Sequence, residues 1–152
     1  PWLTKGYIKD KVSSIKLWEG GYMHTGDVGY IDETGSLIIT DRIKDVIKSG
    51  GEWISSLELE DIASKCDGVK EVAAIGVPDQ KWGERPILIV SLDGKVKKSD
   101  ILFNVKNKIK QHVDAGIISK WAMPDKIEFV SEIDKTSVGK INKKLLREKF
   151  KT

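Results

Sequence analysis

The chain has 152 residues, enough for one ordinary domain or for a compact domain with a piece of another. Its 26 basic and 23 acidic residues give a formal net charge of +3, which is too balanced to indicate nucleic-acid binding by itself. No apolar run approaches the roughly 20 residues that a membrane span requires, and one cysteine with two histidines offers neither an internal disulfide nor a metal-ligand cluster, so we expect a soluble, cytoplasmic protein.

The first part of the chain carries signals for extended structure. The opening PWLTKGYIKD has neither an initiating Met nor the apolar stretch of a secretory signal, so we expect the interior of a longer protein. β-Branched and aromatic residues cluster over residues 14–18 and 28–41 and indicate extended chain in both ranges. Within the second range, VGYID and SLIIT flank the turn sequence DETG and predict a β-hairpin.

The next segment, DRIKDVIKSGGEWISS, is first charged and then glycine-rich. Gly50 and Gly51 free the backbone at this point. We therefore expect a domain boundary or hinge here.

A helix is predicted directly after this segment. Ser55 and Glu58 have the spacing of a capping box. An apolar stripe at helical spacing follows and predicts about three turns, with the cysteine as a core residue: Leu57, Leu59, Ile62, Ala63 and Cys66.

The remaining elements alternate between strands and helices. The apolar runs VKEVAAIGV and PILIVSLDG predict two buried strands on either side of the loop PDQKWGER. Ser99 is the predicted cap of a second helix, KIEFV predicts a third strand, and a basic helix is expected from about Asn142. This order predicts a small α+β domain from about residue 45, with a three-stranded sheet flanked by helices.

Three polar, glycine-containing stretches are candidates for function: HTGDVG at 24–29, DRIKDVIKSGGEWISSLELE at 41–60 and KTSVGKINK at 135–143. Each alone has an ordinary explanation as a turn, a capped loop or a solvated basic end. The last stretch continues into KKLLREKF, so it could be a basic tail or could present one lysine for chemistry. The occurrence of all three stretches in one chain, in this order, is harder to attribute to chance.

Together with QKWGERP at 80–86 and SKWAMPD at 119–125, these stretches resemble the C-terminal signature segments of the adenylate-forming superfamily. The resemblance covers nearly the whole chain and is closest to the fatty acyl-CoA synthetases. It implies a reaction in two steps, in which ATP and a carboxylic acid give an acyl-adenylate and the acyl group then passes to coenzyme A.

By this resemblance Lys140 is the lysine of the first step. A flexible point cation that reaches carboxylate and phosphate oxygens suits the charge that gathers around the α-phosphate. The neighbouring basic residues of the last helix are interpreted as a solvated face that could attract phosphates: Lys143, Lys144, Arg147, Lys149 and Lys151.

The resemblance also implies a nucleotide site and a hinge. Asp27 matches the aspartate that accepts hydrogen bonds from the ribose hydroxyls, and Arg42 matches an arginine that contacts the nucleotide nearby. Lys44 falls at the hinge position. Residues 1–40 would then be the tail of a large N-terminal domain, 41–44 the hinge and 45–152 a mobile C-terminal domain.

The hinge implies that one domain serves both steps. After adenylation it would carry Lys140 away and bring residues 48–53 to the active site. Gly50 and Gly51 would allow a close approach to the pantetheine arm of coenzyme A. Lys48, Glu52 and Trp53 would line the same face, although Trp53 could equally be structural. Trp82 and Trp121 are interpreted as core or interface residues, and His24 and His112 have no assigned role.

Several features depart from the family or lie outside the chain. Asp134 and Lys135 stand where the family often has Pro and a basic residue, and no Ser/Thr/Gly-rich phosphate loop, acyl pocket or Mg²⁺ ligand is found in the sequence. We expect partners to be the N-terminal domain of the same protein, a fatty acid, ATP and coenzyme A, with Mg²⁺ held elsewhere. Peripheral membrane association of the full enzyme is a further option.

Other interpretations remain open at this point. The protein could be a different adenylate-forming ligase, acting on an aryl or branched-chain acid, or a domain that serves only as a partner surface. A basic nucleic-acid module is disfavoured, because the chain lacks aromatic platforms interleaved with basic residues.

Overall fold

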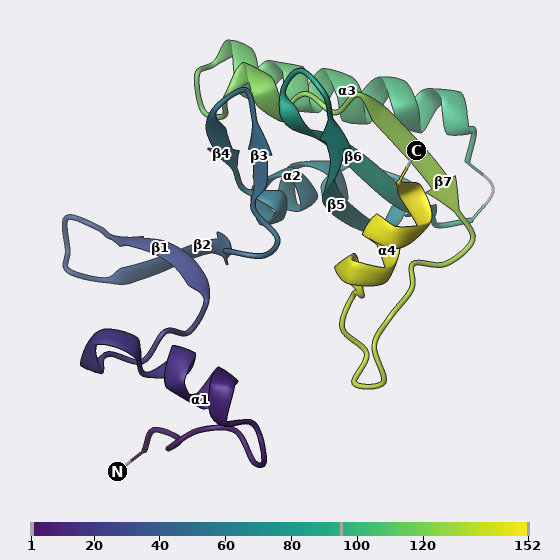
Figure 1. Cartoon of the computed structure of the whole chain (residues 1–152). Helices are drawn as coiled ribbons and strands as arrows, with labels where there is room; N and C mark the ends of the chain where they lie inside the picture. The colour runs from purple at the N-terminus through teal and green to yellow at the C-terminus, as the bar shows by residue number, and fades with distance from the viewer. Residues whose placement is uncertain (1, 95, 152) are drawn as a thin grey trace. The chain divides into compact units, whose positions relative to one another are not determined.

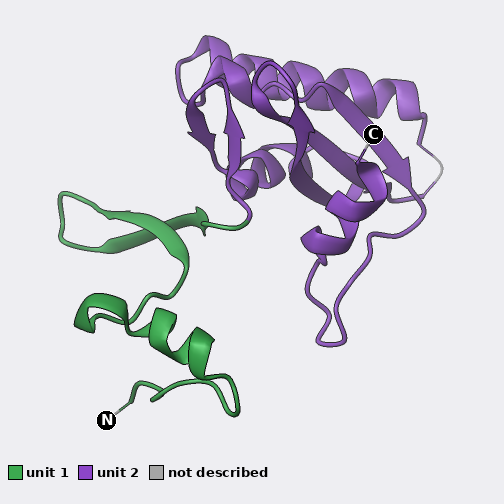
Figure 2. Cartoon of the chain, viewed as in Figure 1, with its two compact units in different colours: residues 1–44 green, residues 45–152 purple. Residues whose placement is uncertain are grey.

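The computed structural model describes residues 2–94 and 96–151, and the chain divides into two compact units, residues 1–44 and 45–152 (Figure 2). Each unit has its own sheet. The first has a two-stranded hairpin and the second a five-stranded sheet with helices on both faces (Figure 1).

The first unit consists of helix α1 (Lys11–Leu17), the 3₁₀ turn η1 (Glu19–Gly21) and strands β1 (Asp27–Ile31) and β2 (Leu37–Arg42). The predicted hairpin is therefore confirmed. Its turn is closed by Asp32, whose carboxylate accepts hydrogen bonds from the Thr34 hydroxyl and from the backbone N–H groups of residues 34 and 36. These bonds favour the ionised form, so the pKa of Asp32 lies below its usual value, with the Thr34 hydroxyl as the largest cause.

The prediction of extended chain at residues 14–18 was wrong, because α1 occupies most of this range. Asp10 caps the helix by accepting a hydrogen bond of 2.9 Å from the Ser13 N–H. The Ser14 hydroxyl donates to the Asp10 carbonyl at 2.6 Å and accepts from the Tyr7 N–H at 2.8 Å. Local side-chain bonds thus overcome the weak strand preference of this stretch.

Within its described residues, the second unit contains a five-stranded sheet, three α-helices and one 3₁₀ turn. In chain order they are β3 (Ile47–Ser49), β4 (Glu52–Ile54), α2 (Ser56–Ser64), β5 (Val69–Asp79), β6 (Gly83–Leu92), α3 (Lys98–Asp114), η2 (Lys120–Ala122), β7 (Lys126–Val130) and α4 (Lys143–Phe150). The predicted α+β class is confirmed.

Strand β6 is the centre of this sheet. It pairs with β5 in antiparallel and with β7 in parallel fashion, and these are the three strands that the sequence predicts. The short hairpin β3–β4 extends the sheet, because Ser49 at the end of β3 pairs with Gly83 at the start of β6. The glycine-rich segment is therefore the turn of a small hairpin on the sheet.

The alternation of apolar residues along β5 and β6 builds two cores. Ala74 and Leu88 face a core shared with α2 and α3, whereas Ile75 and Ile89 face a second core that includes Leu146 of α4. In Figure 1, α4 accordingly lies on the other side of the sheet from α3. Cys66 is buried in the first core, as predicted.

One of the two predicted helix caps is confirmed, and the closing helix begins next to Asn142 as expected. Ser55 accepts from the Glu58 N–H at 3.1 Å, and Asn142 accepts from the Leu145 N–H at 3.1 Å. The prediction for Ser99 was wrong. Helix α3 begins at Lys98, and the Ser99 hydroxyl inside its first turn donates to Asp100 instead.

Within the described part of the chain, no helix has the length and apolar character needed to cross a bilayer.

Candidate functional site

Asp27 and Arg42 face each other at one end of the β1–β2 hairpin. They are directly opposite in the strand register, and Arg42 Nε lies 3.4 Å from Asp27 Oδ1. The Arg42 side chain is 57% exposed and that of Asp27 is 27% exposed, and an ion pair this exposed contributes little to stability. A carboxylate beside a guanidinium donor fork is suited to a polar ligand with adjacent hydroxyl groups, such as a ribose.

A hollow of about 820 Å³ lies within the first unit, and Asp27 is in its wall. Thr25 and Gly26 line it next to Asp27, and Leu17 and Ile43 add apolar surface. Gly26 has a φ of +77°, which turns the chain sharply just before β1. The hairpin therefore presents its acidic residue toward an open space large enough for a ligand.

Lys44 lies in a turn after β2, at the last position of the first unit. Its side chain is exposed. The structure thus places the predicted hinge residue at the boundary between the two units. The movement that a hinge implies stays a prediction.

The five residues predicted to face coenzyme A all lie in the β3–β4 hairpin. Lys48 and Trp53 are opposite in the strand register, and the Lys48 ammonium lies 5.3 Å from the centre of the Trp53 ring. Trp53 is 60% exposed, so this cation–π pair forms an open surface. Glu52 is also exposed, and Gly50 and Gly51 make the turn with φ values of +61° and +83°.

The two glycines differ in what surrounds them. A Cβ on Gly50 would lie 2.5 Å from Cε2 of Trp121, whereas a Cβ on Gly51 would meet open space. Gly50 also donates its N–H to the Trp82 carbonyl at 3.0 Å. Gly50 is thus required for packing against the domain, and Gly51 leaves the outer side of the turn open.

Lys140 lies in the loop that joins β7 to α4. Residues 135 and 141 form an isolated bridge, and the Thr136 N–H donates to the Lys140 carbonyl at 2.7 Å. Gly139 precedes the lysine with a φ of +79°. The loop is therefore a small closed turn that holds the backbone of Lys140 while its side chain is exposed.

Among the described residues, the Lys140 ammonium has no ion-pair or hydrogen-bond partner, in contrast to several nearby basic groups. Lys143 bonds to Glu60 at 2.7 Å and to the Ser56 hydroxyl at 2.7 Å, Arg147 bonds to Asp45 at 2.9 Å, and Lys149 bonds to Asp134.

The prediction of a solvated face was therefore wrong for Lys143 and Arg147, whose side chains are only 11% and 25% exposed. They anchor α4 to α2 and to the residue after the unit boundary. Lys140 is left as the cation available to a ligand in this loop.

The hairpin and the Lys140 loop lie at opposite ends of the second unit. Figure 1 shows the turn between β3 and β4 at one end of the sheet and the loop between β7 and α4 extending from the other. The structure therefore does not bring these two groups of predicted site residues together.

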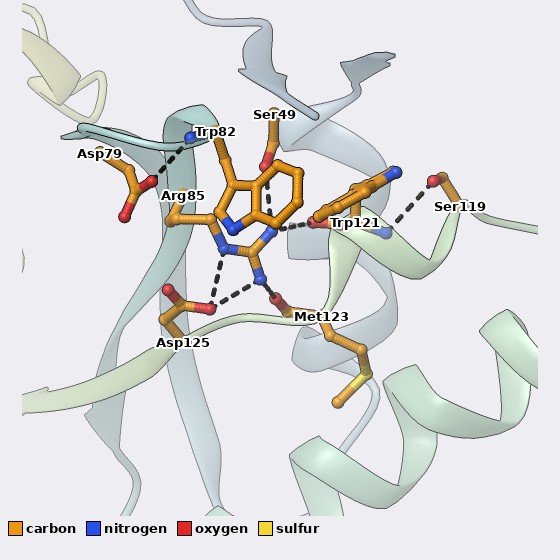
Figure 3. Close-up of polar contacts among 8 residues, drawn as sticks. All are labelled: Ser49, Asp79, Trp82, Arg85, Ser119, Trp121, Met123 and Asp125. Carbon is orange, nitrogen blue, oxygen red and sulfur yellow. Dashed lines mark hydrogen bonds and ion pairs between the residues drawn. The ribbon is translucent and has the colours of Figure 1, made fainter. Parts of the chain in front are cut away.

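A side-chain cluster that sequence reasoning missed connects Ser49 of the hairpin to β6 and to residues 119–125 (Figure 3). Arg85 of β6 is 13% exposed and uses all its guanidinium nitrogens. Nη1 donates to the Ser49 hydroxyl at 2.9 Å and the Trp121 carbonyl at 3.2 Å. Nη2 donates to the Met123 carbonyl at 3.1 Å, and Nε and Nη2 donate to Asp125 at 2.9 and 2.6 Å.

Two tryptophans complete this cluster. The Trp82 and Trp121 rings lie 4.5 Å apart at an angle of 51° (Figure 3). Asp79 shapes the turn before β6 by accepting from the Trp82 N–H at 2.7 Å, and the Ser119 hydroxyl accepts from the Trp121 N–H at 3.2 Å. The QKWGERP and SKWAMPD segments supply most of the cluster, but spacing within either segment does not show that they meet.

Residues 58–140 match the AMP-binding enzyme C-terminal domain family, and the matched range ends on Lys140. The chain belongs to this family. The resemblance inferred from the polar stretches is confirmed, and AMP-binding C-terminal domains are parts of adenylate-forming enzymes.

Individual relatives are similar over nearly the whole chain. The chain is 39% identical to a long-chain-fatty-acid–CoA ligase of Thermus thermophilus over 99% of its length, and 40% identical to a 3-methylmercaptopropionyl-CoA ligase of Ruegeria lacuscaerulensis, also over 99%. A crystal structure of an anthranilate CoA ligase in complex with anthranoyl-AMP superposes with a TM-score of 0.84 at 28% identity, covering 96% of this chain and 28% of that one.

The chain spans about a quarter of the length of these curated relatives, 27% and 26% respectively. Within residues 2–94 and 96–151, no group of three or more His, Cys, Asp or Glu residues could hold a metal ion.

Proposed function

We propose that the chain is the C-terminal part of a fatty acid–CoA ligase that works in two half-reactions. In the first, a carboxylate oxygen attacks the α-phosphorus of ATP and pyrophosphate leaves, which gives an acyl-adenylate. In the second, the thiol sulfur of coenzyme A attacks the acyl carbon, loses its proton and displaces AMP. Lys140 serves the first step, and the β3–β4 hairpin serves the second.

The observation that carries this proposal is the placement of the loop between β7 and α4 and of the β3–β4 hairpin at opposite ends of one unit (Figure 1). One orientation of the unit cannot deliver both to the same reacting carbon. A rotation at Lys44, on the boundary at residue 44, would present first one end and then the other.

The chemistry of each end fits its step. The Lys140 ammonium has no partner within the described residues and can contact carboxylate and phosphate oxygens as charge develops. The turn at Gly51 has no side chain and faces open space, which allows a slim thiol-bearing arm to pass. Asp27 and Arg42 would hold the ribose of the nucleotide.

The acid is proposed from the relatives. A long-chain-fatty-acid–CoA ligase is among the most similar proteins, and this favours a fatty acid. The similarity to an anthranilate CoA ligase supports an aryl acid as a second candidate. Acid-dependent pyrophosphate exchange by the full-length parent protein, with a series of fatty acids against anthranilate, decides between them.

The central test compares wild type with Lys140→Ala in the full-length parent. Acid-dependent ATP–pyrophosphate exchange measures the first step, and thioester formation from pre-made acyl-adenylate measures the second. We expect exchange to fall by about a hundredfold or more while thioester formation survives. Lys144→Ala, an exposed lysine of the following helix, is the matched control. Unchanged exchange in Lys140→Ala would remove the lysine from the mechanism.

A further inference from the structure

We propose that Arg85 is a positioning residue for the second half-reaction, because it holds the β3–β4 hairpin in the shape that admits coenzyme A. This inference rests on the proposed function of the hairpin. It concerns a residue that touches neither the nucleotide pair nor the Lys140 loop.

The backbone pairing between the hairpin and the rest of the sheet is short. Strands β3 and β4 have three residues each, and β3 pairs with β6 at a single position, Ser49 with Gly83. A two-stranded hairpin of this length is not stable by itself. Its position therefore depends on further contacts. Ile47 and Ile54 are buried in the core. The Gly50 N–H donates to the Trp82 carbonyl, and polar side chains bond to β3.

Arg85 supplies a polar side-chain contact to the base of the turn. Its Nη1 bonds both to the Ser49 hydroxyl, at the last residue before the turn, and to the carbonyl of Trp121. Ser49 is fully buried. One nitrogen thus links the base of the turn to the residue whose indole packs on Gly50.

The remaining donors fix the segment that carries Trp121. Nη2 bonds to the Met123 carbonyl, and Nε and Nη2 both bond to the Asp125 carboxylate (Figure 3). These bonds join residues 36 to 40 positions away in the sequence. A guanidinium can make all of them at once, whereas the ammonium of a lysine has three donors at one point and cannot span them.

The experiment uses Arg85→Lys in the full-length parent, assayed separately in the two half-reactions. We expect thioester formation from pre-made acyl-adenylate to fall about tenfold to a hundredfold, with a raised KM for coenzyme A, because misplacing the turn by about 1 Å is enough for such a loss. Pyrophosphate exchange should stay within about twofold, since Lys140 lies at the other end of the unit.

Two further variants test individual hydrogen bonds of Arg85. Ser49→Ala removes only the bond to the hairpin, and Asp125→Asn weakens only the distant anchor. Both should show the same selective loss, smaller than that of Arg85→Lys. If Arg85→Lys does not fold, these two variants carry the test.

A structural control separates positioning from general loss of stability. Val105 of α3 is fully buried, and Val105→Ala destabilises the domain without changing a residue of the hairpin turn or a hydrogen bond of Arg85. It should affect the two half-reactions equally. Amide exchange over residues 48–53 should accelerate in Arg85→Lys and not in Val105→Ala.

Equal losses in both half-reactions for Arg85→Lys, or no loss in either, would overturn the inference. Failure of the proposed function gives a different result, because wild-type parent would then show neither acid-dependent exchange nor thioester formation.

Discussion

Gly50 lies directly against the indole of Trp121, so close that a Cβ at residue 50 would be 2.5 Å from Cε2. Its neighbour Gly51 has a similar positive φ but open space at the corresponding point. The two glycines therefore separate the cost of a side chain in the left-handed region from the cost of a clash.

We predict that Gly50→Ala destabilises the chain more than Gly51→Ala does. In both variants the strain of an alanine at positive φ lowers the free energy of unfolding by about 1 kcal/mol. Only Gly50→Ala must also displace the Trp121 indole, which lowers it by roughly a further 1–3 kcal/mol. The urea midpoint Cm of the 152-residue chain, followed by circular dichroism, measures the difference. Equal midpoints would contradict the packing described for Trp121.

Lys143→Met tests the ion pair between α4 and α2. The Lys143 and Glu60 side chains are only 11% and 14% exposed, so removing the cation leaves a largely buried carboxylate without its charged partner. We expect a loss of about 2–3 kcal/mol in the free energy of unfolding. The matched control is Lys110→Met, because the pair with Asp114 in α3 is about 60% exposed and should contribute less than about 0.5 kcal/mol. A loss no larger than that of the control would show that the buried pair is dispensable.

The single cysteine gives a pH prediction. Burial raises the pKa of the Cys66 thiol, and the nearby Lys108 opposes this only in part. Alkylation by iodoacetamide, which needs the thiolate, should therefore be slower in the folded chain than in urea at pH 8 and should rise with pH. Mass spectrometry measures the rate. Equal rates in the folded and unfolded chains would contradict the burial of this side chain.

The same shift has a consequence for stability. Because the folded pKa of Cys66 lies above the unfolded value, its contribution to stability is complete below the unfolded pKa and is lost as the pH rises through the folded pKa. Wild type should thus lose stability from pH 8 to 10 more steeply than Cys66→Ala. The difference in Tm between the two proteins, measured across this range, tests the sign.

Lys44→Pro in the full-length parent tests the predicted hinge. Proline fixes φ and also restricts the preceding Ile43, whereas Lys44→Ala leaves the backbone free. We expect Lys44→Pro to lower thioester formation by about tenfold or more while pyrophosphate exchange persists, because it blocks a conformational step between the two reactions. An equal effect of Lys44→Pro and Lys44→Ala would assign the role to the side chain and not to the backbone.

Most of the second unit could be predicted because its signals are local or periodic. The strands β5, β6 and β7 follow apolar runs, and the Ser55 cap acts on a residue three positions away. The first unit was harder to predict from the sequence. Helix α1 depends on Asp10 and Ser14, whose polar groups bond to the backbone of a segment rich in β-branched residues.

The candidate site could be predicted only in part, because some of its contacts join residues that are far apart in the sequence. Lys140 and the Gly50–Gly51 turn lie in recognisable stretches, but the role of Arg85 depends on partners far away in the chain. Neither the charge of an arginine nor its apolar neighbours shows which carbonyls it will meet. Likewise, Lys143 looks like its solvated neighbour Lys144 until α4 is placed against α2.

The anchoring of α4 by Arg147 and Asp45 bears on how the two steps would be kept in order. Asp45 follows the unit boundary directly, and α4 follows the Lys140 loop, so this ion pair connects the start of the second unit to the end that carries Lys140. Under the proposed function, withdrawing Lys140 and delivering the hairpin are then one event. The hairpin that admits coenzyme A would be away from the active site while Lys140 is there. The geometry of one unit would then set the order of the two steps, and the enzyme would not need to bind ATP more tightly than coenzyme A to keep that order.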